Sequence, residues 1–348
     1  MGGRCRLAGP AGIRSLEPSR VTEGAFGTAS TRRRRRDNRA ATRRSVQMVA
    51  SERWIVSDDR RTPVGHVAAK TLRKRFDAVW AELRAACAMP DHVEHVHQLR
   101  VATRRALAAI DAFRDLIPAK SRAWFEKRLR RLRRAAGEAR DLDVLAERLA
   151  NDRAARARSR LVAMLAKQRR TSRTPIREQL EQLVDTDWPS RVDRLLEDVH
   201  GRRRHTCFET FARRRFKPLI EAFFETADRK LRDNDEIHAL RIEGKKLRYA
   251  LEIFATVFPA RARVRCEQSL ERLQKTLGEF NDHASAADRF ERWARSTDVG
   301  PNRPMLVTLR DDENQQADLA RKAFSKWWNP SRRRSLRRRL ERTLRRSA

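Results

Sequence analysis

The sequence predicts an all-α fold, and three observations support this prediction. From Pro63 onward, apolar residues recur at the three- and four-residue spacing of helices almost throughout. The β-strand signal is negligible, because tyrosine occurs once and no run of alternating Val, Ile and Thr is present. Many positions of residues 97–149 also recur in 238–290 at a constant offset of 141, which is typical of an internal duplication. We therefore predict two antiparallel four-helix bundles related by a pseudo-twofold axis, over about 60–185 and 190–328.

The first two helices have clear boundaries and a clear buried face. One helix is expected between Pro63 and Pro90, because proline suits the first turn of a helix and disfavours its continuation. The second is expected from about Asp91 to Ile117, ending before Pro118. Its predicted buried seam consists of Val96, Leu99, Thr103, Ala106, Ile110, Phe113 and Ile117.

Later boundaries are read from glycine, proline and capping residues. A basic helix over about 120–136 is expected to end at Gly137, and Asp141 is expected to cap the next helix. Pro175 and Pro189 are predicted to break the helical pattern. Helices are then expected at 190–228, 235–258, 260–277 and 282–295, followed by one that ends at Trp328.

Both ends of the chain are rich in arginine. Residues 1–50 hold 12 Arg against three acidic residues and lack periodicity, so we expect a disordered basic arm. Translation that begins at Met48 is the alternative explanation of this segment. Residues 331–348 hold nine Arg against one acidic residue. We expect a basic tail there, which could form a helix only once something neutralises its charge.

The charge of the chain favours a polyanionic partner. The net charge is +35, and +18 of it lies between the two arginine-rich ends, so the folded part is itself basic. The four cysteines form no CxxC pair, which predicts free thiols in a reducing compartment; they are Cys5, Cys87, Cys207 and Cys266. No apolar segment is long enough to span a membrane, and we expect a cytoplasmic protein.

Each repeat places a stripe of basic residues beside its apolar seam. Side chains at i, i+3 and i+7 share one face of a helix. The two stripes are His97, Arg100 and Arg104, and His238, Arg241 and Lys245. Because these stripes border the buried face, their charged groups should line the rim of a groove between helices. Phosphate groups are the best ligands for such a groove, since arginine offers a fork and lysine a point charge.

Further basic residues recur in the helix that follows each stripe. The equivalent pairs are Lys120 and Arg261, Arg122 and Arg263, Arg131 and Arg272, and Arg134 and Lys275. A solvated helix face is the simpler explanation for any single arginine, whereas the repeated set favours anion binding. Thr103 and Gly244 occupy equivalent seam positions, where a small residue would allow a neighbouring helix to approach closely. The histidines could hold an arginine or a helix end when neutral, or add charge when protonated.

We expect no enzyme, because nothing in the sequence assembles a nucleophile, a base and a metal. The chain contains no P-loop, no HExxH motif and no Ser/His/Asp arrangement. Asp141 and Asp282 are explained better as helix caps than as catalytic or Mg²⁺-binding residues. His92, His95 and His97 lie close in sequence but lack Cys or carboxylate partners that recur in both repeats. We therefore predict neither a metal nor a cofactor.

The paired motifs resemble the CHAD family, the conserved histidine α-helical domain. The matching segments are His97-Gln-Leu-Arg-Val-Ala-Thr-Arg-Arg105, Gly137-Glu-Ala-Arg-Asp-Leu-Asp-Val144, His238-Ala-Leu-Arg-Ile-Glu-Gly-Lys-Lys-Leu-Arg-Tyr249 and Leu273-Gln-Lys-Thr-Leu-Gly-Glu-Phe-Asn-Asp282. The resemblance covers about residues 60–328. It implies two helical bundles around a basic central pore that binds inorganic polyphosphate, often at polyphosphate granules. The pore residues that it implies are His97, Arg100, Arg104, Arg105, His238, Arg241, Lys245, Lys246 and Arg248.

The chain departs from the family pattern in two respects. In the first repeat, Ala106-Leu107-Ala108 replaces the Leu-Arg that usually follows the arginine pair, so one pore cation is missing. The CYTH triphosphatase domain often fused to family members is absent from this sequence, which implies a stand-alone binding protein. The alternatives are a sequence-nonspecific nucleic-acid-binding protein or a basic scaffold, with weak nucleic-acid contacts through the basic ends. The sequence leaves the oligomeric state and the preferred polyphosphate length open.

Overall fold

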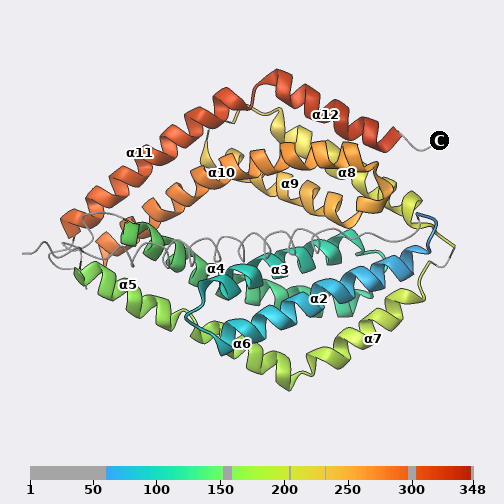
Figure 1. The fold of residues 1–348 in the computed structure, drawn as a ribbon, viewed down its shortest axis with the longest axis horizontal. Helices are drawn as coiled ribbons and strands as arrows, with labels where there is room; N and C mark the ends of the chain where they lie inside the picture. Colours follow the sequence, from blue (N-terminus) through green and yellow to red (C-terminus); the bar gives the residue numbers. More distant parts are fainter. Residues whose placement is uncertain (1–59, 152–158, 204, 232, 297–302, 346–348) are drawn as a thin grey trace, which may run out of the picture. The chain divides into compact units, whose positions relative to one another are not determined.

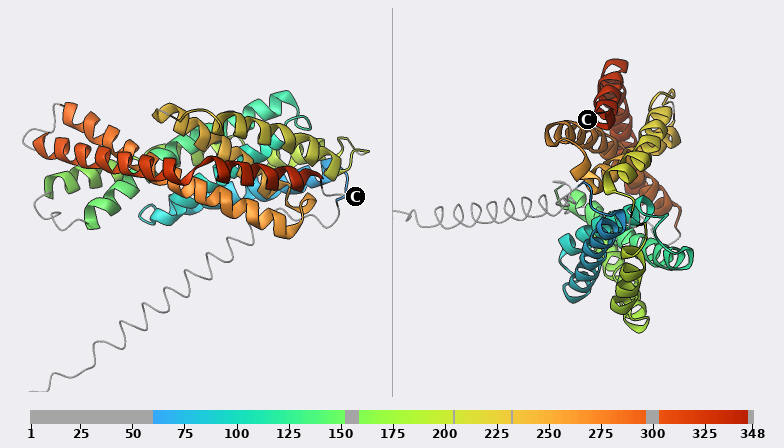
Figure 2. Two further views of the ribbon diagram at one scale, coloured as in Figure 1. Left: turned by 90° about the horizontal axis from the view of Figure 1, so that it is seen from above. Right: turned by 90° about the vertical axis from the view of Figure 1, so that its right-hand side faces the viewer.

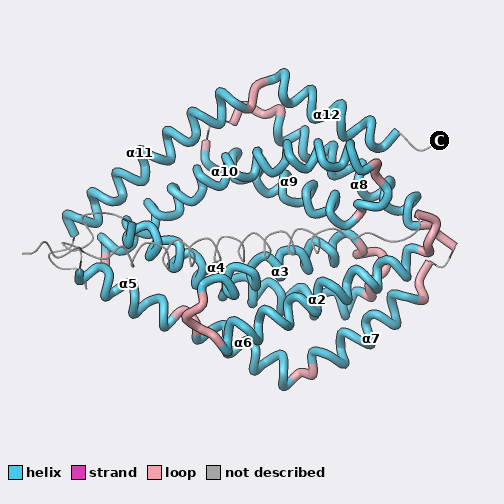
Figure 3. The backbone as a smooth tube through the Cα atoms, viewed as in Figure 1, coloured by secondary structure: helices cyan, strands magenta, loops and turns pink. Residues whose placement is uncertain are grey.

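The computed structural model describes residues 60–345 apart from 152–158, 204, 232 and 297–302. Within these residues, every regular element is a helix, and the only extended pairing is an isolated bridge between Pro63 and Cys207 (Figure 3). The predicted all-α fold is therefore confirmed for this part of the chain. The predicted arm over residues 1–50 and the alternative start at Met48 lie outside the described residues.

The first half is built around three helices that lie side by side. These are α2 (Val64–Ala88), α3 (Val93–Ala112) and α4 (Ala119–Asn151), with α3 in contact with both others (Figure 1). Three shorter helices follow, namely α5 (Ser159–Thr171), α6 (Thr174–Asp185) and α7 (Trp188–His200). The breaks predicted at Pro175 and Pro189 are confirmed, because each proline lies in the first turn of α6 or α7. Proline is tolerated there since its missing N–H has no intrahelical partner to lose.

The second half repeats the central helix pair of the first. It consists of α8 (Phe208–Ala227), α9 (Asn234–Ile253), the short 3₁₀ helix η2 (Ala255–Val257), α10 (Ala260–Arg295), α11 (Arg303–Trp327) and α12 (Pro330–Arg345). Both ends of α9 lie 141 residues after the corresponding ends of α3, and α10 begins 141 residues after α4. The offset between the sequence repeats is therefore also the offset between two helix pairs.

The predicted boundaries at Gly137 and Asp141 are wrong. Both residues lie inside α4, and their equivalents Gly278 and Asp282 lie inside α10, so the separate helices expected at 260–277 and 282–295 are one. A glycine inside a helix costs only about 1 kcal/mol. The buried seam of α4 continues across the glycine through Ala136, Ala139, Leu142 and Leu145. Packing of this seam outweighs the local preference to stop.

The prediction of two four-helix bundles also needs correction, because the fourth helix of each half is broken. In the first half its place is taken by α6 and α7, which contact α2, and in the second half by α11 and α12, which contact α10. Figure 2 shows the blue-to-green helices on one side and the yellow-to-red helices on the other. The predicted seam of α3 is confirmed, since all seven of its residues are buried.

The two halves share one hydrophobic core. Helix α3 contacts α9, and the core contains residues from both halves. At its centre, the equivalent residues Phe113 and Phe254 meet edge to face, with their ring centroids 6.2 Å apart. A smaller cluster joins the ends of α4 and α5 to those of α10 and α11 around Leu145, Leu165 and Phe290. The halves are thus held together at two places.

The C-terminal segment is a packed helix, which corrects the prediction of a basic tail. Helix α12 contacts α8 and α10, and the side chains of Leu336 and Leu340 are buried in the main core. Its arginines find partners at the end of α8. Arg337 donates a 2.9 Å hydrogen bond to Asp228, and Arg333 donates one of 3.1 Å to the Ala227 carbonyl. The segment is therefore a packed helix, and Asp228 supplies a carboxylate that offsets part of its charge.

Two further sequence predictions concern cysteines and membranes. Cys87, Cys207 and Cys266 are free thiols, as predicted, and Cys5 lies outside the described residues. Among the described helices, none is both long and apolar enough to cross a membrane.

Candidate functional site: a basic pocket between α3, α9 and α10

A pocket of about 700 Å³ lies between α3, α9 and α10. Six of its eight lining residues are basic, and a single carboxylate, that of Glu271, lies among them. The lining residues are Arg104 from α3, Arg241, Lys245 and Arg248 from α9, and Glu271, Arg272, Gln274 and Lys275 from α10. The spacing of the α9 residues, at i, i+4 and i+7, places all three on one face of that helix.

The basic groups in the pocket lie close enough to lower the pKa values of their neighbours. Burial lowers the pKa of the Lys245 amine to about 6, and four neighbouring arginines add to this effect. They are Arg241, Arg104, Arg100 and Arg248. Burial also lowers the pKa values of Arg104 and Arg241. In the ligand-free protein at pH 7, Lys245 is therefore mostly uncharged, and an anion in the pocket would favour its protonation.

The pocket contains more hydrogen-bond donors than acceptors. Among the described residues, the buried Nε atoms of Arg104, Arg241 and Arg248 have no hydrogen-bond partner. A buried donor without an acceptor costs free energy. Phosphate oxygens are acceptors only, so a phosphate chain would supply what this pocket lacks.

Gly244 sets the close approach of α9 and α10 beside the pocket. A Cβ atom at this position would lie 2.6 Å from Gln274 Nε2 and 3.1 Å from Leu273 Cδ2. The close packing lets Gln274 Nε2 donate a 3.2 Å hydrogen bond to the Arg241 carbonyl. The small residue predicted at this seam position is therefore required by packing. At the equivalent position, the Thr103 hydroxyl is buried and donates to the Leu99 carbonyl at 2.9 Å.

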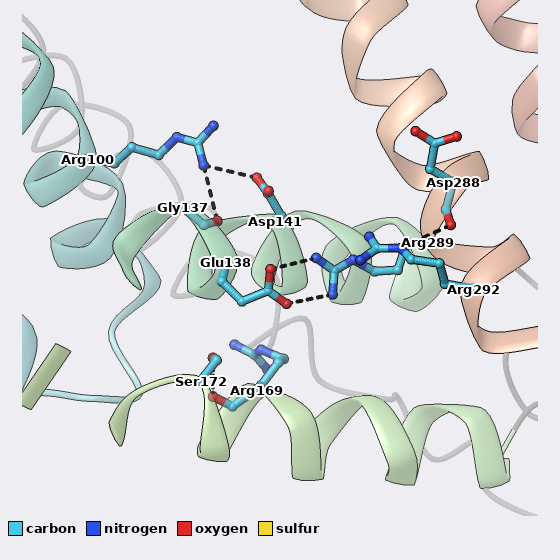
Figure 4. A network of polar contacts seen from close by, with 9 residues as sticks. All are labelled: Arg100, Gly137, Glu138, Asp141, Arg169, Ser172, Asp288, Arg289 and Arg292. Carbon is cyan, nitrogen blue, oxygen red and sulfur yellow. Dashed lines mark hydrogen bonds and ion pairs between the residues drawn. The ribbon is translucent and has the colours of Figure 1, made fainter. Parts of the chain in front are cut away.

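Arg100 does not line this pocket, and its side chain reaches toward α4 (Figure 4). Its Nη1 donates to the Gly137 carbonyl and to Asp141 Oδ1, both at 3.1 Å. A Cβ atom on Gly137 would lie 3.1 Å from the same nitrogen, so the glycine leaves room for the guanidinium. Asp141 is thus an ion-pair partner of Arg100, where the sequence predicted a helix cap.

The two motif histidines have different surroundings. His238 Nδ1 lies 3.3 Å from Asn281 Oδ1, within hydrogen-bond distance. The equivalent of Asn281 in the first repeat is Arg140. Burial lowers the pKa of His97, and the charge of Arg140 lowers it further. His97 is therefore neutral at pH 7 in the ligand-free protein, and neither histidine lines the pocket.

Two of the predicted pore residues form ion pairs with carboxylates of the protein itself. Arg105 Nε donates a 3.1 Å hydrogen bond to Glu252, whose side chain is 1% exposed. Lys246 Nζ lies 2.6 Å from Glu243 on the same helix. Neither Arg105 nor Lys246 lines the pocket. Arg105 instead links α3 to α9.

Arg122 and Arg263 occupy equivalent positions and make equivalent structural contacts. Arg122 Nη1 donates to the Arg114 carbonyl at 3.1 Å, and Arg263 Nη1 donates to the Ala255 carbonyl at 2.8 Å. Each accepting carbonyl lies just after the helix that carries the histidine motif. This pair therefore closes a helix end in both repeats, and its role in phosphate binding stays a prediction.

The second repeat contributes more lining residues to the pocket than the first. Arg272 and Lys275 line it, whereas their first-repeat equivalents Arg131 and Arg134 are exposed outside it. Lys120 and Arg261 are likewise exposed and outside the pocket. The pocket thus contains six of the predicted residues, namely Arg104, Arg241, Lys245, Arg248, Arg272 and Lys275.

Sequence reasoning missed Glu271 and Gln274, which also line the pocket. Their first-repeat equivalents are Arg130 and Arg133, so a search for recurring residues passes over them. It also missed a bidentate contact between the halves, in which Arg289 donates to Glu138 at 2.8 and 3.0 Å (Figure 4). Hydrogen bonds from Arg289 lower the pKa of Glu138.

In the described part of the chain, no group of three or more His, Cys, Asp or Glu residues could hold a metal ion.

Comparisons with known proteins identify the family. The family model of the CHAD domain matches residues 70–291. The fold is similar to the crystal structure of the CHAD domain from the plant Ricinus communis, with a TM-score of 0.65 and 19% identity over 82% of this chain and 94% of that one. It is also similar to PptA from Streptomyces chartreusis, with a TM-score of 0.50 and 19% identity over 77% and 99% of the two chains. No curated protein matches the sequence. Because the family model covers more than half of its length, this chain belongs to the CHAD domain family.

Proposed function

We propose that the protein binds inorganic polyphosphate in the pocket between α3, α9 and α10. The observation that carries this proposal is the lining of the pocket, with six basic residues, one carboxylate and buried donors that lack acceptors. Polyphosphate presents one negative charge or more at every unit and only acceptor atoms. Membership of the CHAD family, which is related to polyphosphate binding in general, supports the same ligand.

The chemistry of the pocket favours an inorganic chain over a nucleic acid. None of the eight lining residues is aromatic, so the pocket offers no ring on which a base could stack. Arginine forks and lysine amines would contact phosphate oxygens directly, and release of counterions would contribute to affinity. We propose that the protein acts by binding alone, and that it is cytoplasmic and associates with polyphosphate granules.

Charge-reversing variants of the full chain test the proposal. The Arg104→Glu/Arg241→Glu variant should bind long-chain polyphosphate about 100-fold more weakly than the wild type, a loss of about 2.7 kcal/mol. The matched control is Arg131→Glu/Arg134→Glu, which changes charge equally at exposed positions outside the pocket. Its affinity should fall less than tenfold. Equal losses in the two variants, measured by titration calorimetry, would show that only the overall charge matters.

A further inference from the structure

A second basic pocket, of about 440 Å³, lies between α10 and the segment that joins α11 to α12. Four arginines line it and no carboxylate does. The lining residues are Arg265, Gln268, Ser269 and Arg272 from α10, Trp327 and Trp328, and Arg332, Ser335, Leu336 and Arg339 from α12. On α12, Arg333 and Arg337 form the ion pairs with Asp228. None of the four arginines that line the pocket takes part in these pairs.

Three of the four arginines of the second pocket contact neutral groups. The guanidinium carbons of Arg272 and Arg332 lie 5.3 and 5.5 Å from the ring centroid of Trp327. Arg339 Nη1 donates to Ser269 Oγ at 3.3 Å. Cation–π contact orients a guanidinium without using its N–H groups. These side chains therefore keep most of their donors available to an anion.

The two tryptophans that line this pocket each have a buried indole nitrogen. Among the described residues, neither Trp327 Nε1 nor Trp328 Nε1 has a hydrogen-bond partner, and Trp328 is only 5% exposed. The indole N–H can only donate. A buried donor of this kind is normally satisfied. Both unsatisfied donors belong to residues that line the pocket.

Arg272 connects this pocket to the first one. It lines both pockets, and the other α10 residues follow in order along the helix, from Arg265 in the second pocket to Lys275 in the first. These two positions are separated by about 15 Å along the helix axis, at 1.5 Å per residue. One extended anion could therefore contact both pockets while Arg272 contacts its middle.

We infer that the second pocket is a further subsite for the same polyphosphate chain, reached across Arg272; this inference rests on the function proposed above. The subsite depends on Trp327, Trp328 and α12, which lie beyond the residues matched by the family model. Binding in both pockets joins two contacts through one ligand, which raises the affinity for long chains above that for short ones.

The environment of Trp327 favours an inorganic chain over a nucleotide in this subsite. Its ring stacks on Trp328, with centroids 5.6 Å apart and planes 27° from parallel, and two guanidinium groups also lie against it. A nucleobase would have to displace these contacts before it could stack. A chain of phosphates needs only the donors.

The test compares two variants of α12 in the full chain. Arg332→Glu/Arg339→Glu reverses charge in the second pocket, and Arg334→Glu/Arg338→Glu does so at exposed positions of the same helix outside it. For long-chain polyphosphate, we expect the first variant to bind about tenfold more weakly than the second, which is about 1.4 kcal/mol. For tripolyphosphate, which is too short to reach both pockets, the dissociation constants of the two variants at the first pocket should agree within about twofold.

Each result of this test decides between separate claims. Equal long-chain affinities of the two α12 variants would overturn the subsite while the function of the first pocket stands. Tighter binding of ATP than of tripolyphosphate, lost in Trp327→Leu, would overturn the inorganic ligand in favour of a nucleotide. An Arg104→Glu/Arg241→Glu variant with unchanged long-chain affinity would instead overturn the proposed function, whatever the α12 variants do.

Discussion

Arg105 of α3 and Glu252 of α9 form a buried ion pair between the two halves of the protein, with Arg105 Nε 3.1 Å from the carboxylate. Glu252 also lies 3.9 Å from Arg248 Nη1, at the edge of the candidate pocket. The residue equivalent to Glu252 in the first repeat is Asp111, whose side chain is exposed. The pair therefore has no counterpart in the other repeat, and it fixes α3 against α9 where the pocket begins.

Removal of this carboxylate should destabilise the fold. We expect Glu252→Ala to lower the free energy of unfolding by about 3 kcal/mol, because it leaves buried arginines without their counter-charge. The control is Glu225→Ala, which removes an exposed partner of Arg229 and should change stability by less than about 1 kcal/mol. Urea denaturation followed by circular dichroism measures both. Similar values for the two variants would show that Glu252 contributes no more than a surface charge.

Polyphosphate binding should take up a proton at Lys245. The pKa of its amine is about 6 in the ligand-free protein, and bound phosphate raises it. Above pH 6, the amine is mostly neutral before binding and charged afterwards, so affinity should rise as the pH falls toward 6. At pH 8, calorimetry in buffers of different ionisation enthalpy should show proton uptake by the wild type and by Lys275→Met. Uptake that persists in Lys245→Met would contradict this assignment.

The same lowered pKa affects stability without ligand. The unfolded chain holds the Lys245 proton up to about pH 10.5, whereas the folded protein releases it near pH 6. The unfolded state therefore binds more protons between these values, and stability rises with pH across this window. Lys245→Met should weaken that dependence and stabilise the ligand-free protein at pH 7. Thermal unfolding at pH 7 and pH 9 measures this dependence in both proteins. If Lys245 were charged throughout, the change in stability between the two pH values would be the same in the wild type and in Lys245→Met.

Two glycines of the second repeat should respond in opposite directions to alanine. At Gly244 a Cβ atom would lie 2.6 Å from Gln274 Nε2 and 3.1 Å from Leu273 Cδ2, so we expect a loss of about 1–3 kcal/mol. At Gly278 nothing lies within 4 Å, so the better helix propensity of alanine should stabilise α10 by about 0.5–1 kcal/mol. Chemical denaturation of both variants measures the difference. A stabilising Gly244→Ala would show that α9 and α10 are not closely packed there.

Helix α12 should be part of the cooperative fold. Leu340 is fully buried, and its replacement by alanine should cost about 2–5 kcal/mol of unfolding free energy. Leu319 on α11 is 51% exposed and serves as the control, with an expected loss below about 1 kcal/mol. If Leu340→Ala were as mild as the control, α12 would be a weakly attached tail, as its charge alone predicts.

The helices and their buried faces could be predicted because periodicity reports burial directly. The α3 seam is an example, since every predicted residue from Val96 to Ile117 is buried. The predicted end at Gly137 failed because it used a local preference of about 1 kcal/mol, whereas packing on both sides of the glycine continues the helix. The tail prediction failed for a related reason. The carboxylate that neutralises Arg337 belongs to Asp228, which is 109 positions away in the sequence.

The candidate site was predictable in part. Comparison of the repeats identified Arg104, Arg241 and Lys245, because stripe residues in both copies border the contact between α3 and α9. This comparison could not separate the arginines that line the pocket from those that make structural contacts elsewhere. Arg122 and Arg263 recur because each closes a helix end, and this contact exists only in three dimensions. The second pocket could not be predicted from the repeats, because Trp327 and Arg332 have no equivalents within the repeated segments.

Competition binding measures whether the pocket selects an inorganic phosphate chain. Long-chain polyphosphate bound to the full protein would be challenged with duplex DNA and with RNA at equal phosphate concentration, at about 150 mM salt to screen exposed charges. We predict that polyphosphate is preferred by about 100-fold, or about 2.7 kcal/mol, and that Arg104→Glu/Arg241→Glu abolishes this preference. Equal competition by DNA or RNA, unchanged in that variant, would instead identify a general binder of polyanions.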